Sequence, residues 1–180
     1  MIKKLFFLLL ISTVMIKADA QQTPPSAQTV LSETFSKAKA EKKNVFIIFH
    51  ASWCGWCRKM DASMNDTTCR KFFQDNYVIE HLTVFESQDK KHLENPGAEA
   101  LMLKHSGGKT GIPFWIIYDP AGNVLATALT PEGNNTGCPA SESEVSYFIS
   151  ALKKSAPLDE AMGKAIYERF RRNEIRRRAQ

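Results

Sequence analysis

A continuous apolar run from Val45 to Phe49 is followed within five residues by the first of two cysteines, Cys54 and Cys57. The run is β-branched and aromatic, which is typical of a strand buried on both faces. Such a strand needs helices above and below its sheet. The residues from Cys54 to Met60 have helical character. The pattern therefore places both cysteines where a buried strand gives way to a helix.

The rest of the chain alternates between helical and extended patterns. Helices are predicted over residues 30–43, 54–60, 69–75, 98–105 and 141–154 and after Pro157, and strands over 45–49, 77–85, 114–118 and 124–130. Strands separated by helices imply parallel pairing, and the last two strands form an antiparallel hairpin around residues 119–123. The predicted fold is α/β, a mixed central sheet of about four strands with helices on both faces and an extra C-terminal helix.

The N-terminus has the features of a secretory signal peptide. Met-Ile-Lys-Lys precedes an apolar run from Leu5 to Ile16, and Ala18-Asp19-Ala20 provides a cleavage site. A membrane anchor is the alternative, but 12 apolar residues are fewer than the roughly 20 that span a bilayer. We expect a signal peptide over 1–20, a linker over 21–29, the main domain over 30–155 and a basic amphipathic helix over 156–180. The protein is expected to be periplasmic or secreted.

Charge and cysteine content narrow the function classes. The net charge is +5, and most of the excess lies in the signal peptide and at the C-terminus, so a nucleic-acid-binding surface is not expected. Four cysteines in an exported chain are free to form disulfides.

The Cys54-x-x-Cys57 pair allows three interpretations. A structural zinc site needs four ligands, and neither a second cysteine pair nor a suitable histidine spacing exists here, so no metal is expected. An inert disulfide gains little stability from closing a two-residue loop. In a redox pair, the helix N-terminus would stabilise the Cys54 thiolate as nucleophile, and Cys57 would be the more buried resolving thiol.

The segment from Phe49 to Met60 resembles the active-site segment of the thioredoxin superfamily, in which an apolar strand leads into Trp-Cys-x-x-Cys and a helix. The resemblance continues at Gly111-Ile112-Pro113-Phe114, where the family carries a cis-proline beside the disulfide. It covers roughly residues 30–155, and the Cys-Gly-Trp-Cys centre is closest to exported thiol:disulfide interchange proteins.

The resemblance implies roles for the neighbouring residues. A cis Ile112–Pro113 bond would leave the Ile112 backbone free to pair with an extended substrate beside Cys54. Trp53, Gly55 and Trp56 would complete the substrate contact surface. The redox-active disulfide would serve without any cofactor, on protein thiol and disulfide substrates and with a membrane-linked electron donor.

One departure from the family concerns proton transfer. Many thioredoxins have a buried acid six positions before the first cysteine, and this chain has Ile48 there. The candidates for an alternative proton acceptor are Glu80, Glu86 and His50.

Two further cysteines and the C-terminus leave alternatives open. Cys69 and Cys138 are the candidates for a second disulfide, which would stabilise the fold by roughly 4 kcal/mol; alternatively, a free Cys138 approaches Cys54 as a third thiol. Leu158, Met162, Ile166 and Phe170 form one apolar stripe on the last helix. This helix is expected to pack across the domain, with peripheral membrane or acidic-partner contact by the Arg-rich end as the alternative.

The leading hypothesis is an exported oxidoreductase that reduces protein disulfides. A disulfide oxidase or isomerase of the same fold is the first alternative, because direction depends on relative reduction potential. A non-enzymatic thioredoxin-like binding module is the second.

Overall fold

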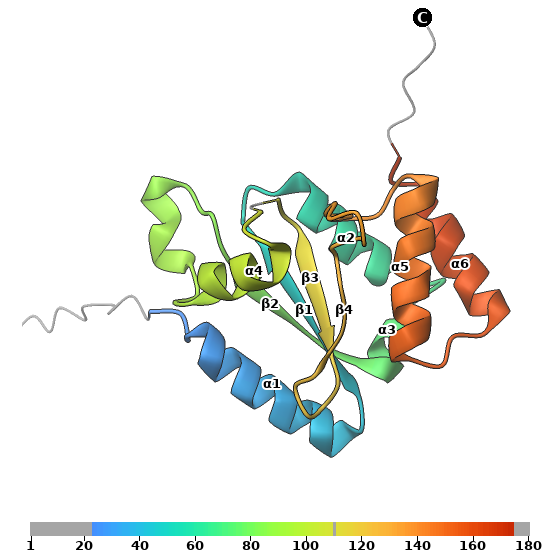
Figure 1. Cartoon of the computed structure of the whole chain (residues 1–180), viewed down its shortest axis with the longest axis horizontal. Coiled ribbons are helices and arrows are strands. Elements are labelled where there is room, and N and C mark those ends of the chain that lie inside the picture. Colours follow the sequence, from blue (N-terminus) through green and yellow to red (C-terminus); the bar gives the residue numbers. More distant parts are fainter. Residues whose placement is uncertain (1–22, 110, 175–180) are drawn as a thin grey trace, which may run out of the picture.

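A computed structural model describes residues 23–109 and 111–174, and its centre is a four-stranded mixed sheet (Figure 1). The order is β2-β1-β3-β4, with β1 Asn44–His50, β2 Tyr77–Thr83, β3 Phe114–Tyr118 and β4 Val124–Thr127. The predicted fold class is therefore confirmed. The proposed signal peptide and the last residues of the Arg-rich tail lie outside the described residues.

The strand directions differ in part from the prediction. β1 and β2 are parallel, whereas β3 is antiparallel to β1 and pairs Phe114 with Phe49. The prediction of parallel pairing across every helix was wrong for β3. After β2, the short 3₁₀ helix η1 (Gln88–Leu93) and α4 (Ala98–Ser106) lead the chain to the end of the sheet at which β1 and β2 finish. As a result, β3 starts beside the end of β1.

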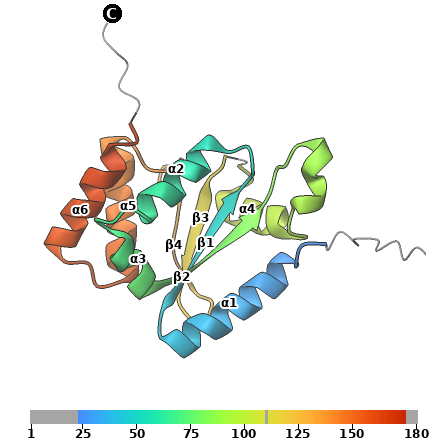
Figure 2. The same cartoon turned by 180° about the vertical axis from the view of Figure 1, so that it is seen from behind.

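Helices cover both faces of the sheet. α1 (Ala27–Glu41) and α4 lie on one face, and α2 (Gly55–Met64), α3 (Arg70–Asn76), α5 (Glu142–Ser155) and α6 (Glu160–Arg171) gather on the other (Figures 1 and 2). β1 accordingly is fully buried from Val45 to Phe49. Within the described residues, no helix is long and apolar enough to cross a bilayer.

The core on the α5 and α6 face is aromatic. Phe148 of α5 packs against Trp115 of β3, with ring centroids 5.3 Å apart, and against Phe170 of α6 at 4.9 Å. Phe73 of α3 stacks on Phe148 at 6.3 Å. Ile166 and Phe170 are fully buried, so the apolar stripe of α6 is used inside the protein, as expected for packing across the domain.

Capping residues explain where helices begin. Ser141 and Glu144 form the predicted capping box of α5. α1 begins at Ala27, inside the predicted linker, because the Ser26 hydroxyl accepts a hydrogen bond from the N–H of Thr29 and so caps the helix earlier than the apolar spacing indicated.

Candidate active site

Cys54 and Cys57 form a disulfide at the start of α2. Cys54 is the N-cap residue of this helix, its Cα lies 5.3 Å from that of Cys57, and its Sγ accepts a hydrogen bond from the Cys57 N–H at 3.1 Å. The two side chains are 3% and 2% exposed. The expected contrast in burial is therefore small in this oxidised state. The geometry places Cys54 against the positive end of the helix dipole.

The loop before Cys54 is held by the residues that follow β2. The buried Glu86 carboxylate accepts hydrogen bonds from the Ser52 N–H at 2.5 Å and from the Ser52 hydroxyl at 2.8 Å. The Trp53 indole N–H donates to the Phe85 carbonyl at 2.8 Å. Phe85 has φ +54°, a backbone conformation that few residues other than glycine adopt. Two loops distant in sequence are thus joined at the disulfide.

Two tryptophans expose apolar surface beside the disulfide. Trp53 is 57% exposed and Trp56 is 39% exposed, although large apolar side chains are usually buried. The ammonium of Lys59 lies 4.1 Å from the centre of the Trp56 ring and covers one face of that ring in a cation–π contact. Gly55 is the first residue of α2 between them. These residues offer an exposed contact surface around the cysteines.

Ile112 and Pro113 also lie beside the disulfide. The peptide bond between them is cis. Ile112 packs against the small buried cluster formed by Ala51, Cys54 and Cys57. The segments around the two sequence motifs, far apart in the chain, therefore come together at one site.

The three candidate proton acceptors lie in different places relative to the disulfide. Ile48 is fully buried, and Glu80 pairs with Ile47, which points to the opposite face of the sheet from Ile48. Glu86 is engaged by Ser52. His50 lies on the α2 side.

His50 belongs to a polar chain that reaches α2. Its ring lies 5.0 Å from that of His81, and His81 Nε2 is 2.8 Å from the Asp61 carboxylate of α2. Burial, together with the neighbouring His81, holds the pKa of His50 below its ordinary value. A neutral imidazole on this face is able to accept a proton.

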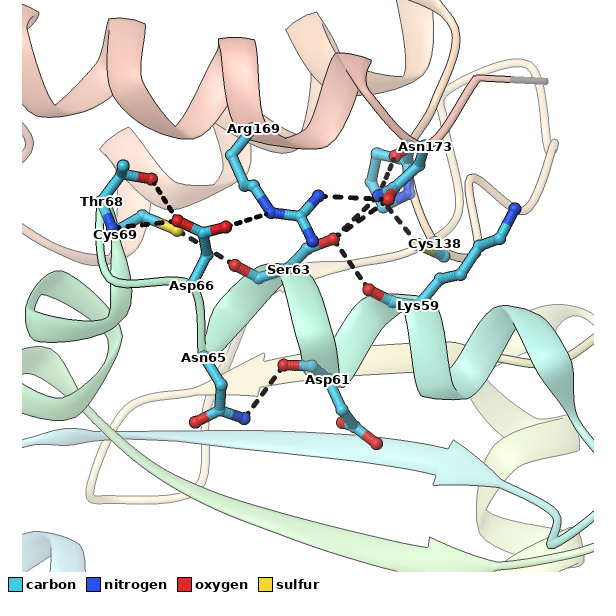
Figure 3. A network of polar contacts seen from close by, with 11 residues as sticks. Lys59, Asp61, Ser63, Asn65, Asp66, Thr68, Cys69, Cys138, Arg169 and Asn173 are labelled. Atoms are coloured by element: carbon cyan, nitrogen blue, oxygen red, sulfur yellow. Dashed lines mark hydrogen bonds and ion pairs between the residues drawn. The ribbon is translucent and has the colours of Figure 1, made fainter. Parts of the chain in front are cut away.

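Cys69 and Cys138 are free thiols in the structure, so the second disulfide is not formed (Figure 3). The Cys69 thiol donates to the Ser63 carbonyl at 3.1 Å, whereas Cys138 Sγ accepts from Asn173 Nδ2 at 3.5 Å. Asn173 Nδ2 also donates to the Ser63 hydroxyl at 2.9 Å. Each thiol therefore has its own polar partner, and the Ser63–Asn173 pair links the two regions.

The sequence analysis did not predict the structural role of three polar residues that shape the site. Asn135 and Asn173 received no role, and Glu86 was considered only as a proton acceptor. Each acts through hydrogen bonds to residues more than 20 positions away. Nothing in the local sequence signals such contacts. In the part of the chain that the structure describes, no group of three or more His, Cys, Asp or Glu side chains could hold a metal ion.

The comparisons with known proteins place the chain in a family. A family model described as Thioredoxin-like matches residues 26–120, more than half of the 180 residues. The chain belongs to this thioredoxin-like family. A search of curated proteins gave no match. With its Cys54–Cys57 disulfide, the protein is a thioredoxin-like thiol–disulfide oxidoreductase that carries the redox centre in its own side chains.

The solved structures that resemble the chain are distant from it in sequence. The disulphide isomerase from Xylella fastidiosa Temecula1 is 18% identical, with a TM-score of 0.48 over 92% of this chain and 98% of that one. DsbH oxidoreductase is 23% identical, with a TM-score of 0.40 over 82% and 95%. Thioredoxin from Wuchereria bancrofti is 22% identical, with a TM-score of 0.38 over 64% and 86%.

Proposed function

We propose that the protein is an exported oxidoreductase that reduces disulfides in other proteins. The observation that carries this proposal is the place of Cys54 at the N-cap of α2. Free N–H groups and the helix dipole favour negative charge on the sulfur of a reduced Cys54 at this position. A thiolate is the form of cysteine that attacks disulfides.

The proposed reaction has two exchange steps. The Cys54 thiolate attacks one sulfur of the substrate disulfide, forms a mixed disulfide and releases the other substrate sulfur as a thiolate, which takes up a proton. The Cys57 thiol then loses its proton and attacks Cys54 Sγ. This step releases the second substrate thiol and forms the Cys54–Cys57 disulfide. The substrate gains two electrons and the protein loses two.

The surroundings of the cysteines support a polypeptide substrate. Trp53, Gly55 and Trp56 provide an exposed surface beside the disulfide, and the half-buried Ile112 packs against the cysteines. An exposed apolar surface of this kind favours contact with another protein. His50 is the proposed acceptor of the Cys57 proton.

Export and electron supply complete the proposal. The signal-peptide features of residues 1–20 support a periplasmic or secreted location. Repeated turnover then needs a dithiol donor outside the cytosol, and a membrane-linked donor is proposed. Contact of the Arg-rich C-terminus with an acidic partner or anionic lipid stays a prediction.

Cysteine variants test the mechanism. With insulin as substrate and dithiothreitol as reductant, we expect Cys54→Ser to react at the background rate. Cys57→Ser that has been reduced and then freed of dithiothreitol should accumulate a mixed disulfide with insulin on Cys54 that mass spectrometry detects, because the resolving thiol is absent. Cys69→Ser is the matched control and should match the parent. Parent activity in Cys54→Ser would contradict the proposal, and equilibration with glutathione buffers would measure the potential that decides direction.

A further inference from the structure

A groove of about 320 Å³ lies beside the disulfide. Its walls come from α2, from residues 111–113, here called the Pro113 segment, and from the loop between β4 and α5, here called the groove loop (residues 130–140). The main lining residues are Trp56, Ile112, Pro113, Asn135, Cys138 and Glu144. Because Ile112 also packs against the two active-site cysteines, the groove is continuous with the redox site.

Asn135 fastens the groove loop to the Pro113 segment. Its Nδ2 donates to the Gly111 carbonyl at 2.8 Å and to the Pro113 carbonyl at 3.2 Å, while its Oδ1 accepts from the Gly137 N–H at 2.9 Å. One side chain therefore holds carbonyls on both sides of Ile112. The spacing of the two walls depends on this amide.

The two walls approach closely at glycines. A Cβ added to Gly111 would lie 3.1 Å from Asn135 Nδ2, and one added to Gly137 would lie 3.5 Å from the Pro113 carbonyl oxygen. Gly137 also has φ +54°, which disfavours other residues. Its carbonyl accepts a hydrogen bond from the Trp115 indole at 3.0 Å. The groove loop is thus seated on the strand that follows Pro113.

The C-terminal part of the chain supports the groove loop from behind (Figure 3). Asn173, which is 8% exposed, contacts Cys138 Sγ and donates to the Ser63 hydroxyl of α2. Arg171 donates to the Ala140 carbonyl. Arg169 is paired with Asp66 at 2.7 Å, which fixes α6 on the end of α2. The active-site helix and the groove loop therefore share one support.

Both the groove loop and its support lie beyond residue 120, where the family match ends. The cysteines and Pro113 belong to the matched region. One wall of the groove therefore lies inside the matched region and the other lies outside it.

We propose that Asn135 is a positioning residue that sets the specificity of this site for extended polypeptide disulfides. This inference rests on the proposed function. The segment beside the substrate cysteine lies in the groove and places an uncharged, apolar side chain against Trp56 and Ile112. Glu144 lines the same groove, where its carboxylate accepts hydrogen bonds from the Ala140 and Ser141 N–H groups. A small disulfide without flanking residues does not use the groove.

Single-turnover kinetics test the inference. Pre-reduced protein is mixed with a cystine-bridged peptide or with bis(2-hydroxyethyl) disulfide, and thiol release is followed. Asn135→Ala should lower the second-order rate constant for the peptide about tenfold, as expected for loss of a hydrogen-bonded clamp, and leave that for the small disulfide unchanged. Asn135→Asp keeps an acceptor for Gly137 but loses both donations, and should behave likewise. Asn134→Ala, which removes an exposed neighbouring amide, is the matched control.

The outcomes separate the inference from the function on which it rests. If the parent reduces neither disulfide, the proposed function is wrong. If the parent reduces both and Asn135→Ala slows both equally, or neither, the inference alone is overturned. Peptides with Leu beside the cysteine should react faster than peptides with Gly there, because Leu contacts Trp56 and Ile112. Equal rate constants of the parent protein for the Leu and Gly peptides would also overturn the assigned specificity.

Discussion

Cys138 shows how burial changes the chemistry of a single residue. It is 5% exposed, and burial raises its pKa to about 12, despite the nearby charges of Lys59 and Arg169. At neutral pH it is a protonated thiol, which is a poor nucleophile. The structure therefore does not favour the expectation that Cys138 attacks Cys54 as a third redox thiol.

The raised pKa of Cys138 predicts a loss of stability at high pH. A folded-state pKa above the unfolded value near 9 adds stability that is fully present below pH 9 and is lost as the pH rises towards about 12. In the oxidised protein, the free energy of unfolding should fall between pH 8 and pH 11 by about 2–3 kcal/mol more in the parent than in Cys138→Ala. Urea unfolding at the two pH values measures this. Asn134→Ala should decline like the parent, and an equal decline in Cys138→Ala would refute the assignment.

At the scale of elements, the loop that carries Cys54 depends on a single buried carboxylate. Glu86→Ala should destabilise the protein by about 1–3 kcal/mol, because the Ser52 N–H and hydroxyl lose their acceptor. Glu86→Gln keeps one acceptor oxygen and should lose less. Thermal unfolding measures the loss of stability. Quenching of tryptophan fluorescence measures how far the loop that carries Trp53 is loosened. Glu33→Gln, an exposed substitution on α1, is the control, and equal unfolding of all three variants would contradict this role.

Local patterns predicted most elements, and long-range contacts account for the errors. Phe114–Tyr118 was predicted to the residue because a short apolar run lies between a proline and an Asp/Gly turn. α5 was predicted from its capping box. The predicted direction of β3 was wrong, because the path of η1 and α4 depends on their packing against the sheet. Strand direction is a property of the assembled layers.

The same division holds for the candidate site. Cys54, Cys57, Trp56 and Pro113 lie in short motifs, so the sequence indicated them and the fold brings them together. Asn135 lies in a Gly/Asn-rich loop that predicts only a turn. Its role arises from hydrogen bonds to residues more than 20 positions earlier, which require the finished fold.

For the whole molecule, the position of α6 predicts that residues 30–155 do not form an independent domain. Ile166 and Phe170 are fully buried, and Phe170 packs against both Phe73 and Phe148. Burying two such side chains contributes about 3–6 kcal/mol, a large share of the 5–15 kcal/mol that stabilises a typical domain. A protein spanning 23–155 should therefore lose most of its cooperative unfolding transition, whereas one spanning 23–174 should keep it. Circular dichroism during heating measures both. Lys164→Ala, which changes an exposed residue of α6, should unfold like the parent. A shortened protein with an unchanged Tm would show that α6 is an appendage, and that the support it gives to the groove loop is not needed for the fold.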